Sequence, residues 1–134
     1  MMIFDGHADL LYDVTKWRQA GEDHVFERRH LPRLQAGQIG GLGLSIWTTV
    51  EQDSIWAAHP DWDGWQRTEE MMACAREELA ECPWLALVRT AAEVRKAQAE
   101  GKLFAFLSVE GMEPVGDRWS GWNSMHSGGP EWGC

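Results

Sequence analysis

The sequence is poor in basic residues and has no long uncharged apolar run. Its 12 lysines and arginines stand against 21 aspartates and glutamates, which gives a net charge of −9, and the basic residues form no patch. Nucleic acids and anionic membrane surfaces bind clustered Lys and Arg, so neither is expected as a partner. No segment has the length and apolarity of a membrane span, and the first residues lack the basic start of a secretory signal. These absences favour a soluble, cytoplasmic protein.

Cysteine is also scarce in this chain. Cys74, Cys82 and Cys134 form no C-x-x-C pair and, being odd in number, no complete disulfide framework. Reduced thiols in a reducing compartment are therefore the simplest account. Cys74 and Cys82 fall on the apolar side of a predicted helix, where thiols are usually inert, so neither is expected to act as a nucleophile.

Several motifs of well-defined chemistry are missing. The glycines between Gly37 and Gly43 precede a strand, whereas a dinucleotide-binding loop must follow a strand and open a helix. Ser45 and Ser108 lack the G-x-S-x-G setting of a serine hydrolase. His24 and His30 have the spacing of zinc-finger ligands but no cysteine pair to complete four ligands, so solvated loop histidines are expected.

What the sequence does contain is an alternation of short apolar strands with amphipathic helices, which is typical of parallel βα units. It predicts an α/β fold, the N-terminal part of a (β/α)8 TIM-like metallohydrolase barrel, because 134 residues are too few for the roughly 250 of a complete barrel. The capping box Thr90-x-x-Glu93 marks the start of one helix. The predicted strands are 1–6, 40–50, 85–88 and 103–109, and the predicted helices are 10–20, 68–82 and 90–100.

Two segments with ligand-forming side chains follow predicted strands. His7-Ala8-Asp9 comes after the first strand, where an extended backbone directs both polar side chains to one face, and Glu110 follows the strand Leu103–Val109. Enzymes with parallel barrels assemble their sites from the loops after the strands, so His7, Asp9 and Glu110 are predicted to bind one metal ion. Taken singly, the His-x-Asp triplet is also compatible with a surface turn, and Glu110 with a simple acid at a strand end.

The last residues of the chain have a different composition. Residues 117–134 contain Trp119, Trp122, Trp132 and four glycines but no Leu, Ile, Val or Phe, so they offer no pattern for a core element. We expect a partial barrel domain over 1–116 and an irregular tail over 117–134. One interpretation is a disordered tail. The interpretation we favour is a frameshifted or truncated coding sequence, because G-rich codons in a shifted frame encode Trp and Gly.

Three stretches carry a family resemblance. Asp5–Leu10 (DGHADL), His30–Gly37 (HLPRLQAG) continuing to Trp47, and Val94–Gly111 together resemble the membrane (renal) dipeptidase family, peptidase family M19, over residues 2 to 116. The resemblance implies an amidohydrolase-like (β/α)8 barrel with two zinc ions. It also implies that His7 and Asp9 bind one ion, that Glu110 bridges both, and that the substrates are dipeptides.

The resemblance also shows what this chain lacks. The family takes two further histidine ligands, an acid and substrate-contacting groups from strands beyond the point where this sequence leaves the pattern. We therefore expect at most one bound ion, a truncated dipeptidase with little turnover, and self-association through the open edges and apolar face of a partial barrel. The alternatives are a non-catalytic remnant of the family and a ligand-binding module built on the nine tryptophans.

Overall fold

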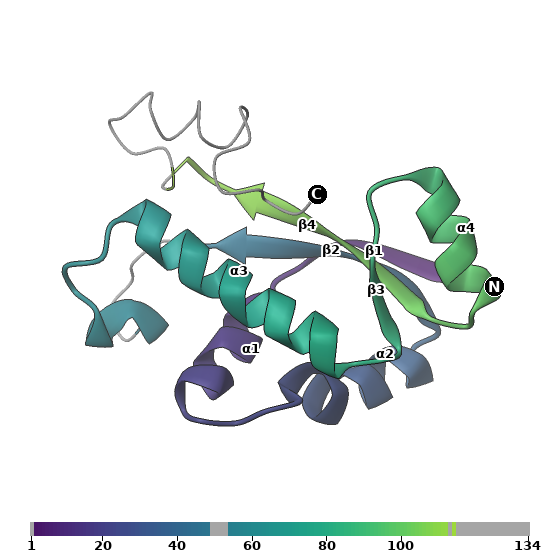
Figure 1. The fold of residues 1–134 in the computed structure, drawn as a ribbon, viewed down its shortest axis with the longest axis horizontal. Helices are drawn as coiled ribbons and strands as arrows, with labels where there is room; N and C mark the ends of the chain where they lie inside the picture. The colour runs from purple at the N-terminus through teal and green to yellow at the C-terminus, as the bar shows by residue number, and fades with distance from the viewer. Residues whose placement is uncertain (1, 49–53, 113, 115–134) are drawn as a thin grey trace.

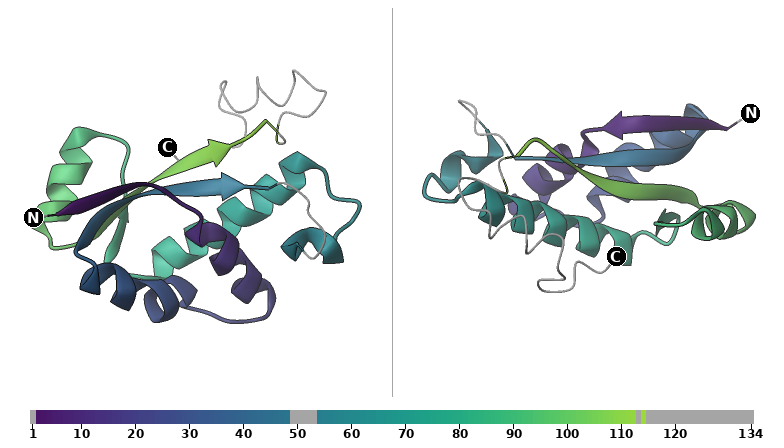
Figure 2. Two further views of the ribbon diagram at one scale, coloured as in Figure 1. Left: turned by 180° about the vertical axis from the view of Figure 1, so that it is seen from behind. Right: turned by 90° about the horizontal axis from the view of Figure 1, so that it is seen from above.

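A sheet of four parallel strands organises the chain, in a computed structural model that describes residues 2–48, 54–112 and 114. The strands lie in the order β1-β2-β4-β3, and α1, α2 and α3 lie on the same side of the sheet (Figures 1 and 2). The elements are β1 (Ile3–Ala8), α1 (Leu10–Gln19), the π-helix η1 (Phe26–His30), α2 (Leu31–Ala36), β2 (Ile39–Trp47), the 3-10 helix η2 (Ile55–Ala58), α3 (Gly64–Glu81), β3 (Leu85–Leu87), α4 (Ala91–Ala99) and β4 (Leu103–Glu110).

The central strands β2 and β4 determine the register of the sheet. They pair continuously from Gly41 opposite Phe104 to Trp47 opposite Glu110. β3 has three residues and pairs only with β4, so it occupies one edge of the sheet, and β1 occupies the other. All pairs are parallel, so the carboxyl ends of β1, β2 and β4 lie along the same edge. The predicted α/β fold with parallel βα units is confirmed.

The main core lies between the sheet and the three helices on its covered side. Leu42, Leu44 and Ile46 of β2 alternate with smaller residues and are at most 1% exposed. They pack in one cluster with apolar residues of α1 and α3, among them Val14 and Met71. Helical residues three or four apart share a face, which explains why these helices bury one side against the sheet.

Aromatic rings occupy the other face of the sheet. The Phe4 ring stacks on those of Phe104 and Phe106, with centroids 6.0 and 5.8 Å apart. Glycine is required below these rings, because a Cβ at Gly41 would overlap the Phe104 ring. Within the described residues, α4 packs on this face only around Phe104, while Phe4 and Phe106 are exposed. The two faces of the sheet therefore differ: one is closed and the other is largely open.

Side-chain caps set the starts of two helices. Asp63 and Gln66 form a capping box, which starts α3 at Gly64, four residues earlier than the predicted Thr68. Thr90 and Glu93 form the predicted capping box of α4. Reading apolar periodicity alone misses the first turn of α3, because the cap defines it.

One expectation about the histidines is wrong. His30 lies at the junction of η1 and α2, which the sequence analysis did not predict. Its side chain is 13% exposed, and its Nε2 lies 3.0 Å from Oδ2 of Asp13 on α1. Burial lowers the pKa of His30, against the opposing effect of Asp13. It is therefore a packed structural residue, not a solvated loop histidine.

The burial of the two described thiols agrees with the sequence analysis. Cys74 and Cys82 are buried and unpaired, and burial raises the pKa of Cys74 to about 11. A thiol with that pKa stays protonated near neutral pH and is a weak nucleophile.

In the residues that the structure describes, no helix has the length and apolarity to cross a membrane. The predicted tail, 117–134, and the domain boundary at residue 116 lie outside the described residues.

Candidate metal centre

An irregularity in β1 positions His7. The pairing of β1 with β2 shifts register between Asp5 and Ala8. Regular alternation from Phe4 would place His7 on the opposite face of the sheet, whereas the shift buries Ala8 in the main core and leaves the His7 side chain 57% exposed. Asp5 Oδ1 accepts a hydrogen bond from the backbone N–H of His7 at 3.1 Å. The Asp5 carboxylate thus stabilises the local backbone that directs His7.

The bulging backbone of β1 lies close over the central strand. A Cβ at Gly43 of β2 would overlap the carbonyl group of Gly6, which immediately precedes His7. Only glycine accommodates this approach without moving one of the strands. The glycine-rich composition of β2 is therefore linked to the position of His7, as well as to the aromatic rings on the same face.

Asp9 lies directly after β1, at the residue that precedes α1. An aspartate at this position usually accepts a hydrogen bond from the first turn of the helix, but its side chain makes no such cap in the described structure. Its Oδ1 instead lies 3.3 Å from Nε2 of His7. Because the Asp9 carboxylate does not cap the helix, it is available to bind a cation.

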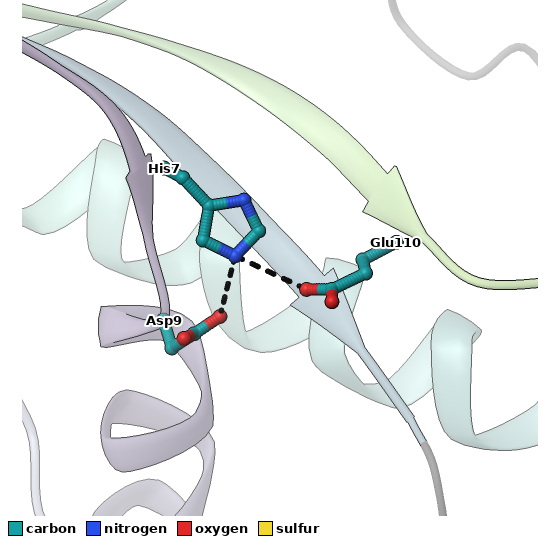
Figure 3. A group of neighbouring side chains, drawn as sticks. All are labelled: His7, Asp9 and Glu110. Atoms are coloured by element: carbon teal, nitrogen blue, oxygen red, sulfur yellow. Dashed lines mark ion pairs between the residues drawn. The ribbon is translucent and has the colours of Figure 1, made fainter.

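Glu110 reaches the same point from β4. It is the last residue of that strand, and Gly111 follows with φ of 83°, a left-handed conformation that favours glycine. Glu110 Oε2 lies 3.1 Å from His7 Nε2 (Figure 3). The structure thus brings together His7, Asp9 and Glu110, the three residues that the sequence singles out, although His7 and Glu110 lie far apart in the sequence.

The three side chains match the requirements of a single cation. One ligand atom from each lies within 4.8 Å of the other two. A tetrahedral zinc ion with bonds of about 2.1 Å separates its ligand atoms by roughly 3.4 Å. The observed distances of 3.1 and 3.3 Å from His7 Nε2 are close to that value. Three protein ligands also leave the fourth position open, as in catalytic zinc sites.

Electrostatics favours a cation at the same point. Asp9 and Glu110 place two carboxylates near each other, and no Lys or Arg of the described residues forms an ion pair with either. Like charges at this separation repel, and a bound divalent cation would neutralise both. All three side chains are substantially exposed, so the site opens to solvent in the described structure.

The sequence analysis missed one residue of this site. Ser45 of β2 is 2% exposed, and its Oγ donates a hydrogen bond to Glu110 Oε2 at 3.1 Å. From the sequence alone, Ser45 is a candidate only for a nucleophile, and it lacks the motif for that role. A small polar residue following two alternating glycines in an otherwise apolar strand was the available signal, because it places a hydroxyl on the face that carries the ligands.

A parallel sheet with imidazole and carboxylate groups at the carboxyl ends of its strands is typical of α/β metalloenzymes. The sequence profile of the membrane dipeptidase family (peptidase family M19) matches residues 1–130. The chain therefore belongs to the membrane dipeptidase family. Among curated proteins, none matches the chain.

Two solved structures show the same fold. A dipeptidase AC, a metallopeptidase of family M19, superposes with a TM-score of 0.69 at 22% identity, over 95% of this chain and 42% of the other. A metallopeptidase from Rhodobacter sphaeroides, bound to a phosphinate mimic of the dipeptide L-Ala-D-Ala, superposes with a TM-score of 0.66 at 24% identity, over 95% of this chain and 43% of the other. The chain thus spans less than half of the length of these two proteins.

Proposed function

We propose that this chain carries the metal-binding portion of a zinc-dependent dipeptidase, with His7, Asp9 and Glu110 as ligands of one ion. The observation that supports the proposal best is the convergence of the three ligand atoms within 4.8 Å, at the carboxyl ends of β1 and β4. The family match supports the reaction class. Imidazole and carboxylate ligands suit zinc, and manganese or cobalt are alternatives for the same donor set.

Each ligand has a distinct task in the proposed site. His7 offers a neutral nitrogen, Nε2, which must be unprotonated to bind a metal. Asp9 and Glu110 offer carboxylate oxygens whose negative charges balance a divalent cation. A bound zinc ion supplies Lewis acidity and lowers the pKa of its water toward ~7, which is the chemistry that peptide hydrolysis requires. The exposure of the three side chains leaves room for a small substrate.

A dipeptide is the proposed substrate. The support is the family of the chain and the phosphinate mimic of L-Ala-D-Ala bound to the Rhodobacter sphaeroides protein, which has the same fold. A phosphinate is tetrahedral at phosphorus and resembles a carbonyl carbon under attack, so tight binding of such a mimic is typical of peptide hydrolysis. We propose that this chain binds peptides of the same size.

The test is to load the purified 134-residue chain with Zn²⁺ and measure release of free alanine from L-Ala-D-Ala and L-Ala-L-Ala. We expect about one ion per chain and little turnover, because the described residues bring together ligands for one ion. A chelator and Glu110→Gln should each abolish whatever turnover is present. Fast turnover sensitive to both would overturn the expectation of low activity, and a chain that binds no metal would overturn the proposal itself.

Self-association is a further part of the proposal. β1 is an edge strand, and its Ile3 and Phe4 are exposed, as is Phe106 on the open face. Unpaired backbone groups and apolar side chains at an edge favour pairing between copies. Sedimentation velocity should show dimers or larger species, and Ile3→Lys should reduce them.

A cytoplasmic location remains a proposal, which the two free thiols Cys74 and Cys82 support.

The alternative of a tryptophan-based binding module receives less support. Trp56 is 1% exposed, and Trp17 packs against the main core below Arg29. Rings in such positions are unavailable for stacking on a sugar or a peptide. The remaining alternative, a non-catalytic member of the family, shares the fold and differs from the proposal only in the alanine-release assay.

A further inference from the structure

We propose that Ser45 is a positioning residue for the metal site, which holds the Glu110 carboxylate in the orientation that binds the ion. This inference rests on the proposed function, because it assumes that Glu110 is a ligand. Ser45 reaches that carboxylate from the neighbouring strand, through a hydrogen bond of 3.1 Å from its Oγ to Glu110 Oε2.

The sheet register places the Ser45 hydroxyl beside the Glu110 carboxylate. Ser45 pairs with Ser108 and Trp47 pairs with Glu110, so Ser45 lies one side-chain repeat before Glu110 on the adjacent strand. Residues two apart in a strand share a face, so Ser45, Ser108 and Glu110 lie on the same side of the sheet. From this position a hydroxyl can contact a glutamate side chain that turns back along the sheet.

Ser45 is held more rigidly than the group it contacts. It lies in the central strand β2, between β1 and β4, and is 2% exposed. The Glu110 side chain is 46% exposed and has several rotatable bonds at the end of its strand. The hydrogen bond from Ser45 restricts the conformations of the Glu110 side chain. Metal binding then costs less conformational entropy, because part of the ordering is already present.

The same oxygen links the hydroxyl to the other ligands. Glu110 Oε2 accepts from Ser45 and lies 3.1 Å from His7 Nε2. An ionised carboxylate only accepts hydrogen bonds, so the Ser45 hydroxyl is the donor and its lone pairs stay directed elsewhere. One lone pair of Glu110 Oε2 thus accepts the hydrogen bond from Ser45. The carboxylate can still bind a cation on the side that faces His7. Partners of this kind typically change metal affinity by ten- to a hundredfold.

The experiment measures Zn²⁺ affinity of the full chain by competition with a chromophoric chelator, and the visible absorption of bound Co²⁺. The variants are Ser45→Ala, Ser45→Thr, Glu110→Gln and the double variant Ser45→Ala/Glu110→Gln. Ser108→Ala is the matched control, because it removes the same hydroxyl from the paired position, where Ser108 makes no hydrogen bond to Glu110 in the described structure. Urea unfolding of each metal-free variant reports stability separately. Ser45→Cys, which is close in size and a weaker donor, replaces Ser45→Ala if that variant does not fold.

We expect Ser45→Ala to weaken Zn²⁺ binding about tenfold and to alter the Co²⁺ spectrum, while Ser108→Ala changes neither. Ser45→Thr, which keeps the hydroxyl, should restore most of the affinity. In the Glu110→Gln background the further loss from Ser45→Ala should be small, because both changes act through one carboxylate. Wild-type affinity in Ser45→Ala would overturn this inference and leave the proposed function intact. Absence of saturable binding by the unsubstituted chain would overturn both.

Discussion

Two clusters of acidic side chains in this chain differ in how their charge is neutralised. In the first, Arg18 of α1 contacts Glu77, Glu78 and Glu81 of α3, at 2.6, 2.6 and 2.8 Å. In the second, Asp9 and Glu110 face each other across a single histidine, and no Lys or Arg of the described residues pairs with them. Arg18 gives the first cluster a permanent cation and a structural role, and we propose that the second cluster, which lacks such a cation, binds an exchangeable metal ion.

Burial separates the same two clusters. Glu78 is 1% exposed, and its carboxylate also accepts hydrogen bonds from the backbone N–H groups of Val25 and Phe26 at 3.0 and 2.7 Å. It therefore joins α3 to α1 and to the start of η1. The carboxylates of the candidate metal centre are exposed and make fewer contacts of this kind. We expect substitutions in the first cluster to change stability, and substitutions in the second to change metal binding.

The largest expected effect comes from removing the cation of the structural cluster. Arg18→Met should lower the free energy of unfolding by about 3 kcal/mol, because it leaves the buried Glu78 carboxylate without its charged partner. Urea denaturation measures the loss. Arg28→Met is the matched control: Arg28 pairs with Asp23 on the surface, and its removal should cost less than about 1 kcal/mol. Equal losses in the two variants would contradict a structural role for Arg18.

A smaller effect is expected from a substitution in the central strand β2, next to the backbone that precedes His7. Gly43→Ala should destabilise the fold by about 2 kcal/mol, because the new methyl group overlaps the Gly6 carbonyl. The strand displacement should also move His7, so Zn²⁺ affinity should fall together with stability. Gly37→Ala serves as the control, because its new Cβ has no atom nearer than 3.4 Å. Unchanged metal affinity in Gly43→Ala would show that His7 does not depend on this approach.

The structural cluster should contribute to the pH dependence of stability. Arg18, with a further hydrogen bond from the His24 N–H, holds the pKa of Glu81 below its usual range. A group whose pKa is lowered by folding stabilises the fold above its unfolded pKa, and this stabilisation is lost as pH falls through the lower, folded value. Stability should therefore fall as pH drops below about 4.5. In Glu81→Gln, urea midpoints between pH 6 and pH 3 should change less, and an unaltered profile would contradict this assignment.

The smallest expected effect on stability lies in the candidate metal centre. Asp9→Asn should change the free energy of unfolding of the metal-free chain by no more than about 0.5 kcal/mol, because Asp9 is exposed and caps no helix. The same variant should weaken Zn²⁺ binding at least tenfold. A large loss of stability with unchanged metal affinity would show that Asp9 has a structural role and is not a metal ligand.

The candidate metal ligands could be predicted because each adjoins a strand end. His7 and Asp9 follow an apolar run, and Glu110 ends another, so a parallel sheet brings them to one edge whatever the details of its packing. Ser45 could not be predicted in the same way. Its contact depends on β2 pairing with β4 in one register, and the sequence does not determine that register.

The structural cluster was also beyond the sequence analysis, although one signal was present. Glu78 falls on the same side of its helix as Met71, Ala75 and Cys82, which are apolar and buried. An acid at such a position requires a buried partner. The sequence did not identify the partner, because Arg18 lies 60 residues away and on another helix.

We propose that the acidic cluster of Asp9 and Glu110, which has no fixed cation, binds a metal ion. The most direct measurement is a Zn²⁺ titration of the purified chain and of Glu110→Gln, with the dissociation constant and stoichiometry obtained by competition with a chromophoric chelator. We expect about one ion per chain and an affinity at least tenfold lower in the variant. Equal affinities, or no saturable binding by the unsubstituted chain, would contradict it.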